Sequence, residues 1–299
     1  MSRSDPAPVV AFQGEAGAYS ERAIARLFPA GARTRGKREA RDAAAAVERG
    51  EADHALLPIE NTLAGSVPDT LAVLADTGLR VVAETILPIH HALLGMEGTD
   101  VDAVKRVLSH PIALAQCARF VRSRPGVRAE SAYDTAGAAH EVARAGDRTL
   151  AAIAGEWVAE TSGLAVIARD IEDRADNQTR FLLLAAPPPD SAKGGRAGPI
   201  AATADETGRR PPMKTMLLVE VDNRPGALVG VLSAFAERRL NLSWLESRPT
   251  GQPWTYRFFM DLDADADDER TAAALGEVRR RASLLRVLGS FPREERTGR

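Results

Sequence analysis

Three adjacent residues, Thr179, Arg180 and Phe181, carry side chains that could together serve a small anionic substrate. A hydroxyl can hydrogen-bond a leaving oxygen, a guanidinium can hold a carboxylate, and an aromatic ring can exclude water. If all three face one pocket, they predict such a site. The tripeptide alone is weak evidence, because it is also typical of a strand that begins after a polar turn, with Arg180 paired to Asp173 or Asp176.

A glycine-containing segment, Gly14 to Glu21, follows the first predicted strand and precedes the first predicted helix. Glycines let backbone N–H groups point into a loop, and the N-terminus of a helix attracts anions. We therefore expect this segment to bind substrate through Gly17, Ala18, Tyr19 and Ser20. The alternative is a tight turn in which Ser20 caps the helix.

A second polar segment, Pro58 to Val67, follows the predicted strand Ala55 to Leu57. Polar side chains just past a buried strand are costly unless they are hydrogen-bonded or meet a ligand. Glu60, Asn61 and Thr62 are therefore candidate substrate-binding residues. The alternative is a self-satisfied turn in which Ser66 or Thr62 caps the helix predicted from Pro68 to Leu74.

Histidines are the remaining candidates for chemistry. His110 lies between a predicted strand and a helix predicted from Ile112 to Val121. It is a candidate substrate-binding residue, although a lone histidine is more often structural. No metal-ligand spacing occurs among His54, His90, His91, His110, His140 and Cys117. We expect no metal. No phosphate loop, dinucleotide fingerprint or Gly-x-Ser-x-Gly sequence is present either, and no cofactor is expected.

The bulk composition favours small molecules or another copy of the chain as partners. The 299 residues predict two domains, and the net charge of -2 gives no reason to expect nucleic acid or an anionic membrane as a partner. The single cysteine, Cys117, excludes an intramolecular disulfide and fits a reducing compartment, the cytoplasm. Neither a signal peptide nor a membrane span is expected from the hydropathy pattern.

Short apolar runs alternate with helical patterns upstream of a Pro- and Gly-rich stretch, which predicts an α/β domain over residues 8–187 with parallel strands and covering helices. The nearly continuous apolar run from Val81 to Leu94 predicts paired strands or a crossover between two lobes. Two lobes imply a cleft, with ligands beyond the carboxyl ends of the strands. Residues 188–212 are predicted to form a flexible linker.

Residues 213–293 show a different order: strand, helix, two strands, helix, strand. This is a ferredoxin-like βαββαβ unit. Its first helix, Ala227 to Arg238, places Leu228, Val231, Leu232 and Phe235 on one apolar face. The exposed sheet edge of so small a domain favours association with another copy of the chain.

Taken together, these segments resemble the prephenate dehydratase family, whose members convert prephenate to phenylpyruvate. The resemblance rests on Gly14 to Glu21, Pro58 to Gly65, Leu87 to His90, Ser109-His110-Pro111 with Ala115-Gln116-Cys117, and Asp176 to Phe181. Downstream, Asn223 to Leu228 and Glu246 to Pro249 are similar to two motifs of the family's regulatory ACT domain.

The resemblance implies a catalytic domain folded like a type II periplasmic binding protein, with the active site in the cleft between its lobes. It assigns catalysis to Thr179. Our own hypothesis adds Arg180 as a second catalytic residue that holds an anion, Phe181 as a packing residue of the site, and Glu60 or His110 as candidate proton donors. Two residues depart from the family pattern: Gln178 stands where a small hydroxyl or amide residue is commoner, and Ile112 where glutamine is frequent.

The ACT domain of the family binds L-phenylalanine at a subunit interface and inhibits the enzyme, which implies a homodimer or homotetramer. The residues that match its motifs are Asn223, Gly226, Ala227, Leu228, Glu246, Ser247, Arg248 and Pro249. No chorismate mutase helix is recognised ahead of Val9, so we expect the monofunctional form. The rival interpretations are an arogenate dehydratase and a non-catalytic amino-acid sensor.

Overall fold

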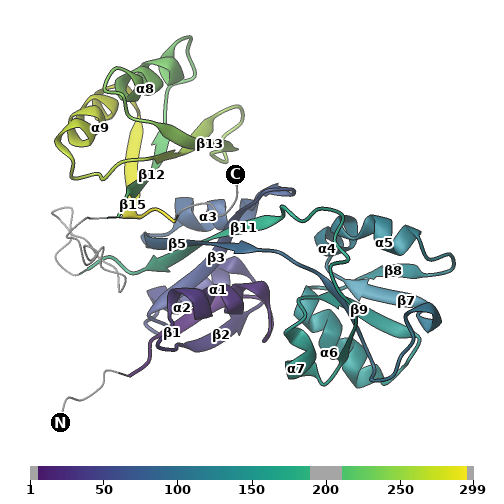
Figure 1. Ribbon diagram of the computed structural model, residues 1–299. Helices are drawn as coiled ribbons and strands as arrows, with labels where there is room; N and C mark the ends of the chain where they lie inside the picture. The colour runs from purple at the N-terminus through teal and green to yellow at the C-terminus, as the bar shows by residue number, and fades with distance from the viewer. Residues whose placement is uncertain (1–5, 189–210, 295–299) are drawn as a thin grey trace. The chain divides into compact units, whose positions relative to one another are not determined.

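The computed structural model describes residues 6–188 and 211–294, so the predicted linker, 188–212, lies almost entirely outside the described residues (Figure 1). The chain divides into two compact units. One comprises residues 1–70 and 85–181, and the other comprises 71–84 and 182–299, as far as they are described. Helix α3 (Pro68–Asp76) and strands β5 (Arg80–Pro88) and β11 (Gln178–Ala185) continue from one unit into the other.

The first sheet has the strand order β2-β1-β3-β11-β5. Strand β1 (Val9–Gln13) pairs in parallel with β2 (Arg33–Lys37) and β3 (His54–Asn61), and β3 forms an antiparallel hairpin with β4 (Gly65–Ser66). Helices α1 (Tyr19–Leu27) and α2 (Ala40–Glu48) connect these strands. With its alanines buried, α2 packs against β1 and β3. These elements form the first lobe.

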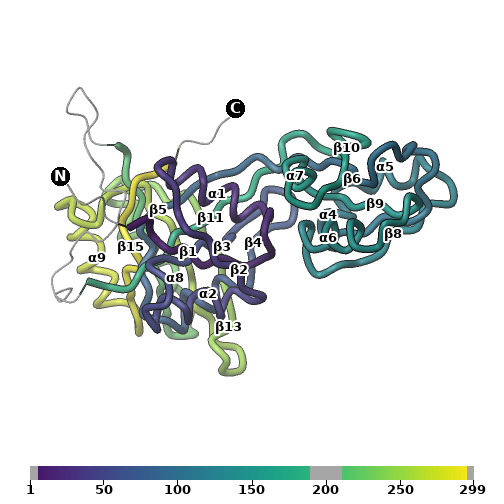
Figure 2. Tube along the Cα trace, turned by 90° about the horizontal axis from the view of Figure 1, so that it is seen from below, coloured from purple at the N-terminus to yellow at the C-terminus, as the bar shows by residue number. Residues whose placement is uncertain are grey.

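The second lobe is built on a sheet of order β10-β6-β9-β7-β8 (Figure 2). Its strands are β6 (Ala92–Gly95), β7 (Arg106–Ser109), β8 (Arg128–Ser131), β9 (Leu150–Ala154) and β10 (Ala165–Ala168). Its helices are the short 3-10 turn η1 (Val101–Ala103), α4 (Pro111–Gln116), α5 (Ala118–Arg122), α6 (Thr135–Ala145) and α7 (Val158–Ser162). Helix α6 packs on β9 and β7, and its buried alanines belong to the core of this lobe.

Two chain segments connect the lobes. The predicted apolar run from Val81 to Leu94 forms β5 and β6, which belong to different sheets, so the run is a crossover and not a pair of neighbouring strands. The chain returns from β10 to β11 through residues 169–177. Both segments are visible between the lobes in Figure 1.

Three expectations about this part of the chain need correction. The helix predicted from Ile112 to Val121 is broken at Cys117 (φ −113°, ψ 23°) into α4 and α5. The second sheet is mixed, because β6 runs antiparallel to both β9 and β10. Residues Pro58 to Asn61, expected in a loop, are the end of β3.

The C-terminal elements confirm the predicted βαββαβ order. They are β12 (Met213–Glu220), α8 (Ala227–Ala236), β13 (Leu242–Pro249), β14 (Tyr256–Leu262), α9 (Glu269–Arg281) and β15 (Leu284–Pro292), with antiparallel strands in the order β13-β14-β12-β15. The predicted apolar face of α8 is also confirmed: Val231 and Phe235 are buried, and Leu228 and Leu232 pack against the same core. No helix among the described residues has the length and apolarity that a membrane crossing requires.

The short segment 71–84 is packed against this C-terminal sheet. Arg286 on β15 donates to the carbonyl oxygens of Ala75 (2.6 Å) and Thr77 (2.7 Å), at the end of α3. A Cβ atom at Gly289 would lie 2.0 Å from the carbonyl oxygen of Val81, so β15 approaches β5 more closely than any other residue type would allow at this position.

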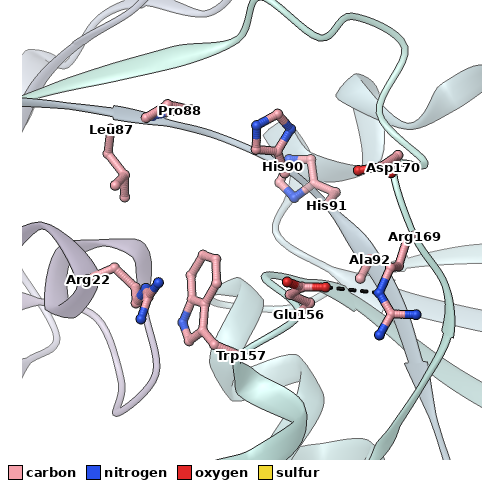
Figure 3. Close-up of a pocket in the computed structure, with 10 residues that line it drawn as sticks. All are labelled: Arg22, Leu87, Pro88, His90, His91, Ala92, Glu156, Trp157, Arg169 and Asp170. Atoms are coloured by element: carbon pink, nitrogen blue, oxygen red, sulfur yellow. Dashed lines mark hydrogen bonds and ion pairs between the residues drawn. The ribbon is translucent and has the colours of Figure 1, made fainter.

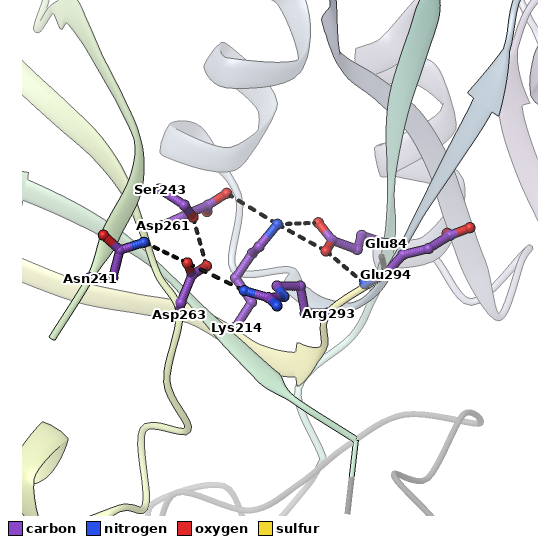
Figure 4. A network of polar contacts seen from close by, with 8 residues as sticks. All are labelled: Glu84, Lys214, Asn241, Ser243, Asp261, Asp263, Arg293 and Glu294. Atoms are coloured by element: carbon purple, nitrogen blue, oxygen red, sulfur yellow. Dashed lines mark hydrogen bonds and ion pairs between the residues drawn. The ribbon is translucent and has the colours of Figure 1, made fainter. Parts of the chain in front are cut away.

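A buried ionic cluster completes this packing (Figure 4). Lys214 Nζ lies 2.9 Å from each carboxylate oxygen of Glu84 and 3.9 Å from the carboxylate of Asp261. The side chains of Lys214, Glu84 and Asp261 are 7%, 0% and 1% exposed. Glu84 also accepts the backbone N–H of Glu294 at 3.0 Å. Because two carboxylates surround one ammonium away from water, removing that ammonium leaves buried negative charge uncompensated.

Replacing Lys214 by methionine should therefore lower the free energy of unfolding by about 3–5 kcal/mol, measured by urea denaturation. The double variant Lys214→Met/Glu84→Leu should recover part of this loss, because it removes one of the stranded carboxylates. Arg106→Met is the matched control, since the Arg106–Glu130 pair is solvent-exposed and should matter little. A Lys214 variant as stable as this control would contradict the prediction.

Candidate active site

A pocket of about 540 Å³ lies within the first unit and is lined by residues of both lobes. Its size suits a small ligand. Seven of the predicted catalytic and substrate-binding residues line it: Ala18, Tyr19, Ser20, Asn61, His110, Thr179 and Phe181. The other four, Gly17, Glu60, Thr62 and Arg180, are not among its lining residues.

The three adjacent residues on β11 do not face the pocket together. Thr179 and Phe181 line it, whereas Arg180 is 5% exposed and does not. Successive side chains of a strand point to opposite faces of the sheet, so the residue between two pocket residues points away. The expectation that the hydroxyl, the guanidinium and the ring sit side by side in one site is wrong for Arg180.

Asn61, at the end of β3, holds the hydroxyl of Thr179. Its Nδ2 donates to Thr179 Oγ1 at 2.9 Å and lies within reach of Asn177 Oδ1 (2.8 Å) and the Gln178 carbonyl oxygen (3.1 Å). Its Oδ1 accepts the backbone N–H groups of Leu63 (3.0 Å) and Ala64 (2.8 Å) in the β3–β4 turn. Both ends of this amide are therefore engaged by the backbone.

The direction of the Asn61 hydrogen bond decides what Thr179 can do. A hydroxyl has one hydrogen to donate and two lone pairs to accept with. Because Thr179 Oγ1 accepts from Asn61, its own hydrogen remains available for a group bound in the pocket. Thr179 is thus prepared to donate to an oxygen of a ligand.

Helix N-termini are the groups of the pocket wall that could attract an anion, because the charged side chains on that wall are the carboxylates Asp69 and Asp134. Residues at the starts of α1, α3, α4 and α6 line it, and none of its described lining residues is lysine or arginine. Helix α6 is capped by Asp134 and α4 by His110, whereas the N-cap of α1, Ala18, has no side chain that can cap. The first N–H groups of α1 are therefore the best-placed donors for an anion.

The residues predicted to bind substrate but absent from the pocket wall have other partners. The N–H of Gly17 donates to Glu21 Oε2 at 2.7 Å, so it is not free to hold an anion. The Thr62 hydroxyl is hydrogen-bonded to the backbone of Asp176 and Gln178. Glu60 lies in the β3–β4 hairpin opposite Ser66. The sequence position of these residues did not show the direction in which each side chain points.

His110 lines the pocket as predicted and also begins α4. Its Nδ1 accepts the backbone N–H of Ile112 at 3.3 Å. Burial lowers the pKa of His110, which favours a neutral ring that carries its hydrogen on Nε2. Such a ring can donate a hydrogen bond to a ligand, but it is a weaker source of a proton than an imidazolium.

The sequence did not predict several residues of the pocket wall as site residues. His91, Gln116, Tyr133 and Asp134 all line it. Asp134 was recognisable as a helix cap and Gln116 as part of the family motif, but His91 was considered only as a metal ligand. The Arg38 guanidinium lies 5.4 Å from the ring centroid of Tyr133.

His91 also lines a second, smaller pocket of about 290 Å³ (Figure 3). Arg22 stacks on Trp157 there, and Glu156 pairs with Arg169 at 3.0 Å. Beside it, His90, Asp170 and Glu172 bring three possible metal-ligand atoms within 4.8 Å of one another, a grouping that sequence spacing did not predict. His90 Nδ1 is already hydrogen-bonded to Glu172 Oε1 at 2.8 Å, so two of the three groups are engaged with each other.

The predicted effector residues occupy two elements of the C-terminal unit. Gly226, with φ 81°, precedes the first residues of α8, Ala227 and Leu228. Residues Glu246 to Pro249 lie on strand β13 and not in a loop, and Glu246 is ion-paired with Arg248 at 3.1 Å. Asn223 lines a separate pocket of about 460 Å³ near the β13–β14 turn, and the other predicted effector residues do not.

Fold and site together define a class: a two-lobed α/β protein with a pocket of small-molecule size between its lobes, joined to a ferredoxin-like domain. Family comparison makes the class specific. The model of the prephenate dehydratase family matches residues 10–189, and the model of the ACT domain matches residues 215–280. The chain belongs to the prephenate dehydratase family and carries an ACT domain, and the predicted fold class is confirmed.

Individual relatives support this assignment. The chain is 38% identical to arogenate dehydratase 2 of Petunia hybrida over 95% of its own length and 71% of that protein. The structure of prephenate dehydratase from Arthrobacter aurescens in complex with L-Phe matches with a TM-score of 0.83 and 33% identity, over 95% of this chain and 90% of that one. GqqA, described as a novel type of quorum quenching acylase, matches with a TM-score of 0.83 and 33% identity, over 96% and 98% of the two chains.

The role of Asn61 can be tested by reversing its hydrogen bond. Asn61→Asp keeps an acceptor for the N–H groups of Leu63 and Ala64 but places a carboxylate oxygen against Thr179 Oγ1, so the hydroxyl must donate to residue 61. In an assay of the family's dehydratase reaction, kcat should fall by about 10²–10³-fold.

The added charge needs its own control. Gln13→Glu places a carboxylate on the same pocket wall, from β1, and should chiefly raise KM for an anionic substrate. If Asn61→Asp and Gln13→Glu change kcat equally, the orientation of Thr179 is not what Asn61 provides.

Proposed function

We propose that the protein is a prephenate dehydratase that converts prephenate to phenylpyruvate, carbon dioxide and water. The observation that carries this proposal is the Thr179 hydroxyl, which accepts from Asn61 and keeps its own hydrogen for an oxygen in the pocket. The proposal takes residues 8–187 as the catalytic domain and 213–293 as the regulatory domain. It also places the protein in the cytoplasm, where the unpaired thiol of Cys117 would stay reduced.

The reaction requires one carbon–carbon and one carbon–oxygen bond to break. The electron pair of the bond to the ring carboxylate enters the ring as carbon dioxide departs, and the ring expels its hydroxyl, which takes up a proton and leaves as water. The product ring is aromatic. Thr179 would donate a hydrogen bond to the departing hydroxyl, where negative charge develops in the transition state.

The charge distribution of the pocket suits this reaction. The uncapped N-terminus of α1 can hold the side-chain carboxylate of the substrate through the N–H groups of Tyr19 and Ser20. A fixed cation beside the ring carboxylate would stabilise the charge that must be lost, and the described lining residues place none there. Neutral donors and helix dipoles can bind the substrate without that penalty.

Arogenate is the second candidate substrate, because the petunia relative is an arogenate dehydratase. It carries an ammonium in place of the keto group and yields phenylalanine. Purified protein should be given prephenate and arogenate in competition, with each product measured. An acylase assay belongs beside it, because GqqA shares the fold. Turnover of neither acid would leave a non-catalytic sensor as the better interpretation.

Thr179→Ala should lower kcat with the preferred substrate by about 10²–10³-fold, because the donor to the leaving hydroxyl is lost. Thr179→Ser, which keeps the hydroxyl, should retain most of the activity. Thr149→Ala, at an exposed threonine outside the pocket, is the control. Full turnover by Thr179→Ala would refute the catalytic role.

We further propose that L-phenylalanine inhibits the enzyme by binding the ACT domain of a homodimer or homotetramer. Two findings support an L-phenylalanine site: the Arthrobacter relative is described in complex with L-Phe, and this chain carries an ACT domain. The N-terminus of α8 after Gly226 would receive the amino acid carboxylate. Arg248→Gln, which breaks the Glu246–Arg248 pair on β13, should weaken inhibition at least tenfold with little change in uninhibited turnover.

The oligomer should be measured with and without phenylalanine by light scattering. A wild-type enzyme whose rate and assembly are both indifferent to phenylalanine would end the regulatory proposal. An Arg248→Gln protein that loses turnover and inhibition together would instead point to a structural role for the pair.

A further inference from the structure

We propose that His91 is a positioning residue of the active site, which holds the side-chain amide of Gln116 so that its N–H end faces Asn61 and the pocket. The inference rests on the proposed dehydratase function. His91 lies in the crossover between the lobes, just before β6. The residue is only 2% exposed, and it lines the active-site pocket. The same ring forms part of the smaller pocket in Figure 3.

The backbone fixes the first amide of this chain of contacts. Leu63 and Ala64 present N–H groups to Asn61 Oδ1, and the Gln178 carbonyl oxygen lies 3.1 Å from Asn61 Nδ2. Backbone donors and acceptors cannot exchange roles, so the oxygen and the nitrogen of the Asn61 amide can be told apart. Turning this amide over would place donors against donors on one side and oxygen against oxygen on the other.

The second amide follows from the first. Gln116 lies 3.5 Å from Asn61 Oδ1, which already acts as an acceptor, so Gln116 must present its Nε2 there. Its Oε1 then faces His91 Nε2 at 2.9 Å. An oxygen in that place requires a hydrogen on the ring nitrogen, and the tautomer of His91 is thereby assigned.

The other ring nitrogen of His91 completes the set of contacts. Burial lowers the pKa of His91, which favours the neutral ring. Because a neutral ring carries one N–H hydrogen, a hydrogen on Nε2 leaves Nδ1 without one. Nδ1 lies 2.9 Å from the hydroxyl of Tyr19, whose hydrogen is shared with the His90 carbonyl oxygen at 2.5 Å. The His91 backbone N–H donates to Glu172 Oε2 at 2.9 Å, which anchors the residue itself.

The consequence concerns the charge that Gln116 shows to a ligand. Gln116 lines the active-site pocket, and its two amide ends carry opposite partial charges. With Oε1 held by His91, the N–H end is turned toward Asn61 and the pocket, which suits an anionic substrate. Without a donor at residue 91, the amide can turn over, and its oxygen would then oppose both Asn61 Oδ1 and the substrate.

Two amide substitutions of His91 separate this role from simple packing. The side-chain nitrogen of glutamine can occupy the place of Nε2 and donate to Gln116, whereas asparagine reaches only the place of Nδ1. We expect His91→Gln to keep kcat within a few-fold of wild type. His91→Asn and His91→Phe should each lower kcat by about 10- to 100-fold, as expected for a misaligned active site.

If His91 had a purely structural role, the kcat values of the three variants would instead follow side-chain volume or thermal stability. Melting temperatures of all three variants should be recorded with their kinetics, and His54→Gln, at a buried histidine of β3 outside the pocket, is the control that should keep its turnover. His91→Asn as active as His91→Gln would overturn the proposal.

A measurement on the unmodified protein tests the assignment independently of turnover. The 15N chemical shifts of the His91 ring at pH 7.5 should identify a neutral ring with hydrogen on Nε2. A ring with hydrogen on Nδ1 would overturn the proposal even if the enzyme turns over prephenate. A wild-type protein that turns over neither acid would instead refute the proposed function while leaving the tautomer as measured.

Discussion

The side-chain amide of Asn61 is the contact on which the geometry of the active-site pocket depends. It joins the end of β3, the turn to β4 and the start of β11, and it reaches Gln116 in the second lobe. Backbone groups on both sides give this amide one orientation. That orientation determines whether each side chain in contact with it must donate or accept a hydrogen bond. A single hydrogen-bond direction, set by strand pairing, thus determines which atom of Thr179 faces a ligand.

The pocket also shows how an anion can be accommodated without a buried lysine or arginine. Its described wall combines helix N-termini, neutral amides and hydroxyls with two carboxyl side chains at helix starts, Asp69 and Asp134, and Asp134 is engaged by the backbone N–H groups of Glu15 and Gly137. Distributed dipoles attract negative charge over the whole cavity and stabilise no single carboxylate strongly. This distribution is compatible with a reaction that must release one carboxylate while it holds another.

Sequence reasoning succeeded where hydrophobic periodicity is strong. The order of the C-terminal elements was predicted correctly, and seven of the candidate site residues line one pocket. It missed β2, a polar edge strand of Arg33, Thr34 and Arg35, because such a strand has no apolar alternation to detect. Arg180 was misplaced because a motif does not show the alternation of its strand, and His91 was overlooked because its partners come from distant parts of the chain.

The ion pair between Lys214 and Glu84 determines whether the catalytic domain can be separated from the C-terminal domain. Glu84 lies in the middle of β5, a strand of the catalytic sheet, yet the ammonium that neutralises it belongs to the first strand of the C-terminal domain. A catalytic fragment cut at the linker would keep the carboxylate and lose its counter-ion. The stability of β5 therefore depends on the C-terminal domain as well as on the sheet to which β5 belongs.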